Sequence, residues 1–387
     1  MNRAVISWIR RTTKRYPAPD WTPDSVRALA RYFSQYAKRR FHVRSMRQAL
    51  AGRIANLEDA EVYLCDHAVP VKAPMVLVSQ VPRSGGTLLS QLFDGHPQLC
   101  ACPHELKFGF PATDSWPDLD PARDAKWNFL RLFNLNFVHH VQRGFVKGDR
   151  NPVRHSFMLM SRLQFGIFKH LMQKAKPGNS REILNHFFTA FFNAWLNYQG
   201  DLKRKRWVTA FAPRLAHFDE QLDSFFSDYP DGVLIQILRD PETWYPSAKN
   251  HAQYGFAKKD AELILNRWRL SAESMLRNRR RFSDKVVIVR FEDLVGRTET
   301  TMRALAVRLG IDWDPILLTP TFNTTPMHAN SSFAVESSGM ILAPLERASM
   351  LSAEERKLID ADCAELYRQV VEQALAIETR PPVRELD

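Results

Sequence analysis

The sequence predicts an α/β fold of three layers, in which helices flank a central and mostly parallel sheet, with a helical extension at the N-terminus. Two observations predict the layers: short apolar runs recur along the chain, and long helical patterns separate them. Such runs are typical of parallel strands that are buried on both faces, and their alternation with helices is typical of a covered sheet. The extension is predicted because residues 1–70 show helical spacing instead, with an N-cap at Asp24-Ser25.

The predicted strands are residues 74–79, 207–211, 233–238 and 286–289. The predicted helices of the same part of the chain are 154–175, 181–199, 217–227, 259–281 and 352–377. The last begins after Ser352, and Glu355 stands where a capping box requires an acid. We therefore predict a basic helical extension over residues 1–70 and one α/β domain over residues 71–387.

The turn after the first strand is the most informative segment. The strand runs into a Ser/Gly turn and then into a helix, with Gly85 and Gly86 at the junction. Such a turn presents backbone N–H groups and a helix N-terminus to an anion, so it predicts a P-loop-like phosphate site. The pattern of nucleotide triphosphatases does not fit, because Gln80 stands in place of the first glycine and Gly86 in place of the lysine.

The turn resembles the first signature of the sulfotransferases that use 3′-phosphoadenylyl sulfate (PAPS), P-[KR]-[ST]-G-[TG]-[TS]-L, which Pro82-Arg83-Ser84-Gly85-Gly86-Thr87-Leu88 matches at every position. The second signature of that family, R-[DN]-P-x₅-S, is matched by Arg239-Asp240-Pro241 and Ser247. A third segment, Val289-Arg290-Phe291-Glu292-Asp293-Leu294, is similar to the family's V-R-Y-E-D-L. The three motifs follow predicted strands in the family's order.

The resemblance implies a donor site for PAPS that needs no metal. It assigns the 5′-phosphosulfate to the first signature, with Arg83 also stabilising charge on the leaving group, and the 3′-phosphate to Arg239 and Ser247. The residues expected to bind the donor are Arg83, Ser84, Gly85, Gly86, Thr87, Leu88, Arg239, Ser247, Phe291, and Ser331 and Ser332 in a loop similar to one that closes over the nucleotide in some bacterial relatives.

The acceptor hydroxyl requires a base, and the resemblance points to Glu105. Glu105 lies 22 residues after Arg83 in the turn, and some relatives carry a catalytic Glu at about this distance from it. His104 is the alternative candidate for the base. The sequence departs from the family at two positions near these motifs. Phe291 stands in place of the family's Tyr, and His251 stands where some relatives place an Arg.

The family's catalytic lysine is also missing. Relatives often carry K-x-P after the second strand, and here that element reads Phe211-Ala212-Pro213. The missing charge is expected to come from Arg83, from Arg214 or from Lys147, unless the protein's activity is weak.

The predicted function is transfer of the PAPS sulfuryl group to an acceptor hydroxyl, with a glycan or glycolipid as the expected acceptor. The alternatives are a tyrosylprotein-type sulfotransferase, a regulatory protein that binds PAPS or its desulfo product with little catalysis, and, more remotely, a P-loop kinase. A zinc site at His96, Cys100, Cys102 and His104 is not predicted, because C-x-C lacks the usual spacing.

The charge is concentrated at the N-terminus. The chain has 387 residues and a net charge of +12, of which residues 1–53 carry +11 through 13 basic and 2 acidic side chains. The domain that follows is nearly neutral, so no nucleic-acid partner is predicted. Residues 1–53 are expected either to contact an anionic membrane or an acidic acceptor carrier, or to pack on the domain as a cap. Four cysteines and the absence of a signal-peptide pattern favour a cytoplasmic location.

Overall fold

The computed structural model describes residues 23–106, 115–133, 145–147, 153–251, 260–327 and 342–377. The chain divides into two compact units, Met1–Tyr63 and Leu64–Asp387. The described part of the first unit belongs to a single long helix, α2 (Pro23–Asp66). The second unit contains the sheet and all other described elements.

The second unit is built on a five-stranded sheet, and its strands are β1 (Met75–Val78), β2 (Leu99–Glu105), β5 (Trp207–Phe211), β6 (Val233–Leu238) and β7 (Val286–Arg290). The strand order is β2-β5-β1-β6-β7, and every neighbouring pair is parallel. The central strands β1 and β6 are buried along their whole length, as their apolar runs predict. The predicted α/β fold with a parallel sheet is confirmed.

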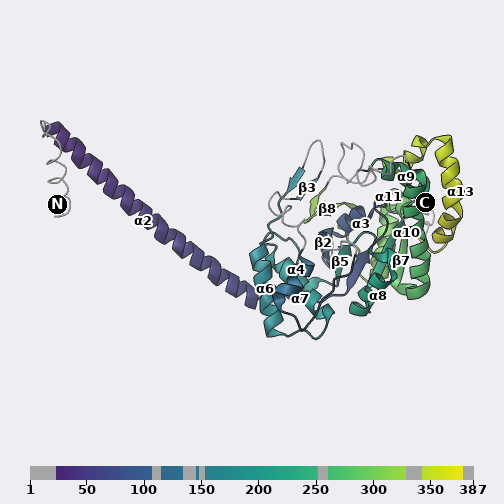
Figure 1. Cartoon of the computed structure of the whole chain (residues 1–387), viewed down its shortest axis with the longest axis horizontal. Helices are drawn as coiled ribbons and strands as arrows, with labels where there is room; N and C mark the ends of the chain where they lie inside the picture. The colour runs from purple at the N-terminus through teal and green to yellow at the C-terminus, as the bar shows by residue number, and fades with distance from the viewer. Residues whose placement is uncertain are drawn as a thin grey trace, which may run out of the picture. The chain divides into compact units, whose positions relative to one another are not determined.

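Helices cover both faces of the sheet (Figure 1). Side chains alternate along β1: Val76 and Val78 pack in a core with α3 (Gly86–Phe93), α11 (Phe291–Gly296) and α12 (Thr298–Leu309). Met75 and Leu77 pack in the core of the other face. The helices of that core are α4 (Ala125–Leu132), α6 (Ser161–Lys174), α7 (Ser180–Ala194), α8 (Asp219–Asp228), α9 (Pro241–Lys249), α10 (Ala261–Phe282) and α13 (Ala353–Val371).

The strand β2 was not predicted from the sequence. Its residues, LCACPHE, include a proline and end in two polar side chains, so they lack the apolar character of the other runs. β2 lies at the edge of the sheet and bonds to β5 alone, with an irregular register between Ala101 and Glu105. An edge strand tolerates Pro103 because one of its sides needs no sheet partner. Two short antiparallel pairs complete the strands: β3 (Phe145–Lys147) with β4 (Val153–His155), and β8 (Thr321–Phe322) with β9 (Thr325–Pro326).

Three predicted helix limits were wrong. The helix predicted from residue 154 begins at Ser161, because residues 153–155 pair as β4. The helix predicted to residue 199 ends at Ala194, after which the Leu196 N–H donates to the Met158 carbonyl at 3.0 Å. The helix predicted to residue 377 ends at Val371, and the Leu375 N–H then donates to the Ile288 carbonyl in β7 at 2.7 Å. The predicted capping box of Ser352 and Glu355 is present at the start of α13.

The second unit is anchored before its first strand. The Val69 N–H donates to the Asn193 side chain and the Val71 N–H to the Thr189 hydroxyl, each at 2.8 Å. Val71 is itself buried in the core. Residues just before β1 therefore belong to the packing of α7. A division of the chain into residues 1–70 and 71–387 stays a prediction.

Candidate active site

The sequence motifs lie where parallel strands end. β1 leads into the turn before α3, β6 into Arg239, β7 into Phe291, β2 ends at Glu105 and β5 at Phe211. Because all five strands are parallel, these carboxyl ends lie along the same edge of the sheet. Ligands of open α/β sheets bind along this edge.

The turn between β1 and α3 has a conformation that its glycines allow. Gly85 is the N-cap of α3 with φ 100°, and Arg83 also has a positive φ of 74°. A Cβ at Gly85 would lie 2.6 Å from the ring of Phe291. A Cβ at Gly86 would lie 2.2 Å from the side-chain nitrogen of Gln80 and 2.5 Å from the ring of Phe211. Two rings and one amide therefore touch the backbone at the start of α3, which leaves no room for side chains there.

Three hydrogen bonds hold this turn in place. The Val81 N–H donates to the Ser271 hydroxyl at 3.1 Å, and the Trp244 indole donates to the Pro82 carbonyl at 2.9 Å. The Arg239 guanidinium donates to the Arg83 carbonyl at 2.8 Å. Carbonyls of the turn thus bond to side chains of α9 and of the β6 end, and its backbone is ordered before any ligand binds. Preorganised donors cost less to bring to an anion than mobile ones.

Arg239 is a buried cation, 2% exposed, at the end of β6. Besides the Arg83 carbonyl, its described hydrogen-bond acceptors are the Thr243 hydroxyl and the carbonyls of Thr243 and Pro344, all of them neutral. Its guanidinium carbon also lies 4.4 Å from the centre of the Phe291 ring. Burial and the nearby Arg347 lower the pKa of Arg239 to about 9. A bound anion would relieve this unfavourable charge.

Arg347 is a residue that the sequence analysis missed. It lies in the 3-10 helix η6 (Ala343–Met350), is 7% exposed, and donates to the Ser247 hydroxyl at 3.2 Å. Burial and the charge of Arg83 lower its pKa to about 10. No motif surrounds Arg347 in the sequence, and only the packing of η6 on α9 brings it to Ser247. It thus joins Arg239 and Ser247 from a segment about 100 residues further along the chain.

Four basic side chains form one electrostatic group, here called the basic cluster: Arg83, Arg239, Arg347 and His251. Burial, and then the charge of Arg83, lower the pKa of His251. The positive charge of Arg83 acts on each of the other three members, which requires them to lie near it. Three arginines beside a P-loop-like turn, two of them with lowered pKa values, are the expected form of a site for a multiply charged anion.

Glu105 and Phe211 are neighbours across the sheet. They are register partners of β2 and β5, and the Leu106 N–H donates to the Phe211 carbonyl at 2.8 Å. The Phe211 ring, where relatives carry the K-x-P lysine, is 5% exposed and covers Gly86. Glu105 is half-buried, and in the strand order β5, which carries Phe211, separates β2 from β1 and its turn.

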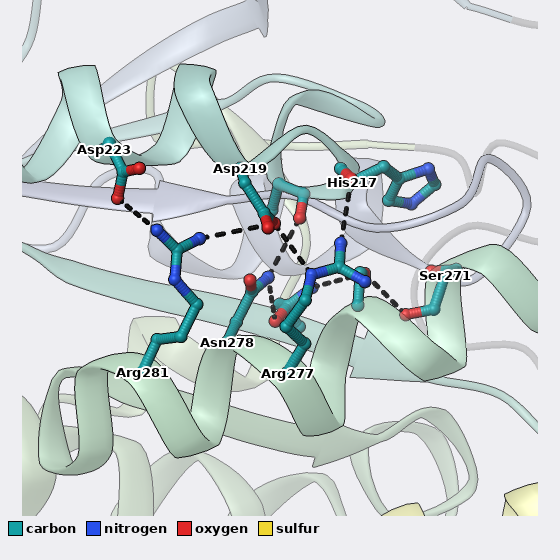
Figure 2. Close-up of polar contacts among 10 residues, drawn as sticks. His217, Asp219, Asp223, Ser271, Arg277, Asn278 and Arg281 are labelled. Carbon is teal, nitrogen blue, oxygen red and sulfur yellow. Dashed lines mark hydrogen bonds and ion pairs between the residues drawn. The ribbon is translucent and has the colours of Figure 1, made fainter.

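The end of β5 is fixed by contacts with α10, which Figure 2 shows. After Phe211 the chain forms the 3-10 helix η2 (Leu215–His217), whose Ala216 carbonyl accepts from the Asn278 side chain at 2.9 Å. Arg277 donates to the His217 carbonyl at 3.0 Å and to Asp219 at 2.7 Å. These bonds attach the segment that follows Phe211 to α10.

Comparison with known proteins shows the family of the chain. Residues 74–315 match the model of the sulfotransferase family. The chain belongs to the sulfotransferase family. No curated protein matches it.

Several solved sulfotransferase structures are similar to the chain. The sulfotransferase domain of the Synechococcus PCC 7002 olefin synthase is 18% identical, with 73% of this chain and 97% of that one covered and a TM-score of 0.36. Sulfotransferase STF9 of Mycobacterium avium is 14% identical, with 82% of each chain covered and a TM-score of 0.38. The sulfotransferase of Alicyclobacillus acidocaldarius is 15% identical, with 78% and 97% covered and a TM-score of 0.38.

The other predicted site residues of this sulfotransferase are distributed as follows. Ser84 is buried, and its hydroxyl has no hydrogen-bond partner among the described residues. Thr87 and Leu88 lie half-buried in the first turn of α3. Ser331 and Ser332 lie outside the described residues. His104 and Lys147 lie in β2 and β3, in positions for which the structure describes the backbone only.

Two cysteines of β2 belong to the hydrophobic core. Cys100 and Cys102 are buried in the core, and burial raises the pKa of Cys100 to about 12 and that of Cys102 well above its ordinary value. The His96 ring contacts the Asp312 carbonyl and accepts from the Gln98 N–H. Within the described part of the chain, no three His, Cys, Asp or Glu side chains are placed to hold a metal ion.

Proposed function

We propose that the protein transfers the sulfuryl group of PAPS to a hydroxyl group of an acceptor. The observation that carries the proposal is the basic cluster, in which Arg239 and Arg347 are buried beside a P-loop-like turn. The buried Arg239, whose described hydrogen bonds go to neutral acceptors, fits a phosphate group of this donor. Membership of the sulfotransferase family supports the same donor.

The roles of the donor-site residues follow from their places in the fold. The backbone N–H groups at the start of α3, with Arg83 and Ser84, bind the 5′-phosphosulfate end, because a helix N-terminus favours an anion. Arg239, Arg347 and Ser247 bind the 3′-phosphate, and we place Phe291 against the nucleotide. PAPS supplies an activated sulfuryl group whose transfer breaks the bond between sulfur and the bridging oxygen. Arg83 stabilises the negative charge that develops on that oxygen.

Glu105 acts as the base in this proposal. The acceptor hydroxyl gives its proton to the Glu105 carboxylate as its oxygen bonds to sulfur, and the desulfo nucleotide leaves. The position of Glu105 at the carboxyl end of β2, across the sheet from Phe211, supports the assignment. His104 is the alternative base.

The Phe211 ring favours a second candidate function. It occupies the position of the K-x-P lysine and covers Gly86, so β5 supplies no cation there. Arg214 follows at the start of η2, with a positive φ of 67° and its N–H donating to the Gln80 carbonyl at 3.2 Å. If none of Arg83, Arg214 and Lys147 replaces the lysine, the protein is a regulatory binder of PAPS or its desulfo product.

Two measurements separate these functions. Calorimetric titration with PAPS and with the desulfo nucleotide tests the donor site, and binding of neither ligand contradicts both functions. Sulfuryl transfer to a panel of glycan, glycolipid and tyrosyl-peptide acceptors then tests for the enzyme. We expect Glu105→Ala to abolish transfer while the affinity for the nucleotide is unchanged. An unchanged rate in this variant would exclude Glu105 as the base, and nucleotide binding without transfer to any acceptor would support the regulatory function.

A glycan or glycolipid remains the proposed acceptor, and a cytoplasmic location is part of the same proposal. No described helix is long and apolar enough to cross a membrane. Contact of residues 1–53 with a membrane is a separate proposal, and the assignments of the donor and of the base do not depend on it.

A further inference from the structure

The helix α2 carries a stripe of exposed apolar side chains. Its members, here called the apolar stripe, are Tyr32, Tyr36, Val43, Met46 and Leu50, which are 49–64% exposed. They are separated by four, seven, three and four residues. These spacings keep side chains on one side of an α-helix, and the stripe extends over roughly 30 Å. Large apolar side chains that are exposed to solvent and gathered on one side of a helix mark an interaction surface.

Basic side chains line both edges of the apolar stripe. Arg40, Arg44 and Arg47 follow one edge, and Arg31 and Lys38 follow the other; all five are exposed. No acidic residue occurs between Ser25 and Leu57, so nothing on this stretch of helix neutralises them. Arg39 lies within the stripe itself, where its aliphatic stem adds apolar surface while the guanidinium reaches outward.

We infer that residues 31–50 of α2 bind the surface of a lipid bilayer that contains anionic phospholipid. An apolar row with cations on both edges matches such a surface, because the row enters the boundary of the acyl chains while the cations contact lipid phosphates. Tyrosine is favoured at this depth, since its ring is apolar and its hydroxyl reaches water. The helix lies along the bilayer and does not cross it, because the apolar stripe occupies one side and the helix carries many charged side chains.

Two other partners fit these residues less well. A second copy of α2 would bring two rows of like-charged arginines together, with Arg39 of each helix in the contact itself. A nucleic acid would require polar side chains on the contacting side, whereas here the side between the arginines is apolar. Phe41 lies on the opposite side of α2, is 77% exposed, and takes no part in the surface.

The test is co-sedimentation of the full chain with lipid vesicles. One set contains phosphatidylcholine alone, and the other contains phosphatidylcholine with phosphatidylglycerol. We expect binding to the anionic vesicles, little binding to the neutral ones, and a loss of binding as salt is raised, since salt screens charges beyond about 10 Å at 0.1 M. Equal binding to both vesicle types, or binding to neither, contradicts the inference.

Two variants and a control separate the parts of the surface. Replacing Arg40, Arg44 and Arg47 by Gln should weaken binding to anionic vesicles by roughly tenfold or more. Replacing Tyr36, Val43 and Leu50 by Gln should also weaken it, and if this variant binds like the parent chain, the apolar stripe is not the contact. The control replaces Lys169, Lys174 and Lys176, which are exposed in the second unit, by Gln and should bind like the parent chain.

Other outcomes identify the alternative partners. If the chain ignores vesicles but is retained by duplex DNA, or sediments as a dimer that the Tyr36, Val43 and Leu50 variant dissociates, the inference is wrong. If the same variant lowers the melting temperature of the second unit, the stripe is a packing surface within the chain and the inference is again wrong. Nucleotide affinity, measured on each variant, should not change, so these results are independent of the proposed sulfotransfer.

Discussion

At the scale of single residues, Gly85 shows most directly what the turn between β1 and α3 requires. It has a positive φ of 100°, and the Phe291 ring occupies the space where a Cβ would lie. Backbone conformation and close packing therefore exclude a side chain independently. Gly310, the C-cap of α12, has a positive φ of 63° but open space around it, so it shows the first effect alone.

We expect Gly85→Ala to lower the free energy of unfolding by more than Gly310→Ala does and to weaken binding of the desulfo nucleotide. The strain of a left-handed alanine costs about 1–2 kcal/mol at either site, and the contact with Phe291 adds to it at Gly85 only. Urea unfolding and calorimetry measure the two effects. Equal destabilisation with unchanged nucleotide affinity in both variants would show that the Phe291 contact does not constrain the turn between β1 and α3.

Arg347 provides a second prediction, on the 3′-phosphate. We expect Arg347→Gln to weaken binding of adenosine 3′,5′-bisphosphate by roughly tenfold or more, because a charge-assisted hydrogen bond contributes about 1.5–3 kcal/mol. Binding of adenosine 5′-phosphate, which lacks the 3′-phosphate, should change little. Calorimetry with both ligands checks this. An equal loss for both ligands would place Arg347 away from the 3′-phosphate or assign it a purely structural role.

The sequence indicated Arg83, Arg239 and Ser247 as candidate donor-site residues but gave no sign of Arg347, and the reason is physical. Arg83, Arg239 and Ser247 stand at fixed distances from strand ends, and such distances are visible in a sequence. Arg347 reaches Ser247 only because η6 packs on α9, and contacts between segments so far apart leave no local pattern. The packing of the Phe291 ring on Gly85 and of the Phe211 ring on Gly86 was not predicted for the same reason, because these contacts depend on the order of the strands in the sheet.

At the scale of elements, four strands of the sheet were more predictable than the fifth. β1, β5, β6 and β7 are apolar because both of their faces are buried. β2 lies at an edge, as β7 does, but it contains Pro103 and ends in His104 and Glu105, so it lacks the apolar pattern of the others. The helix limits at Ala194 and Val371 depend on hydrogen bonds to distant segments, which helical periodicity does not report.

The 3-10 helix η2 makes the stability of the protein depend on pH. Burial, together with the charges of Arg214 and Arg277, lowers the pKa of His217 from 6.5 to about 4. Between these values the unfolded chain binds a proton at His217 and the folded chain does not, so stability falls as the pH is lowered, by about 1.4 kcal/mol per pH unit. Near pH 7 this loss of stability is absent, because His217 is unprotonated in both the folded and the unfolded chain.

We expect His217→Phe to be less sensitive to acid than the parent protein. Urea unfolding at pH 7.5 and pH 5 measures this, and the difference between the two pH values should be smaller in the variant. The pKa values of His96, His186 and His251 are also lowered by burial, so a smaller dependence persists. If both proteins lose the same stability at pH 5, His217 is not the group that titrates.

At the scale of the whole molecule, the second unit begins before its first strand. Val69 and Val71 bond to α7, and Val71 is buried. We expect a chain that starts at Leu64 to melt at a higher temperature than one that starts at Pro74. The loss of two hydrogen bonds and one buried valine costs about 2–4 kcal/mol. Thermal unfolding of the two chains checks this, and equal melting temperatures would show that residues 64–73 add nothing to the unit.

The hydrogen bond from Arg239 to the Arg83 carbonyl has a consequence for how ligands bind in parts. In the proposed donor site it connects the two ends, because we assign Arg239 to the 3′-phosphate end and Arg83 to the phosphosulfate end. Since this bond orders both ends before a ligand arrives, two small fragments, one for each end, should bind independently of each other, and a single compound that joins them loses translational freedom only once. Inhibitors assembled from such fragments would gain more affinity than the sum of their parts.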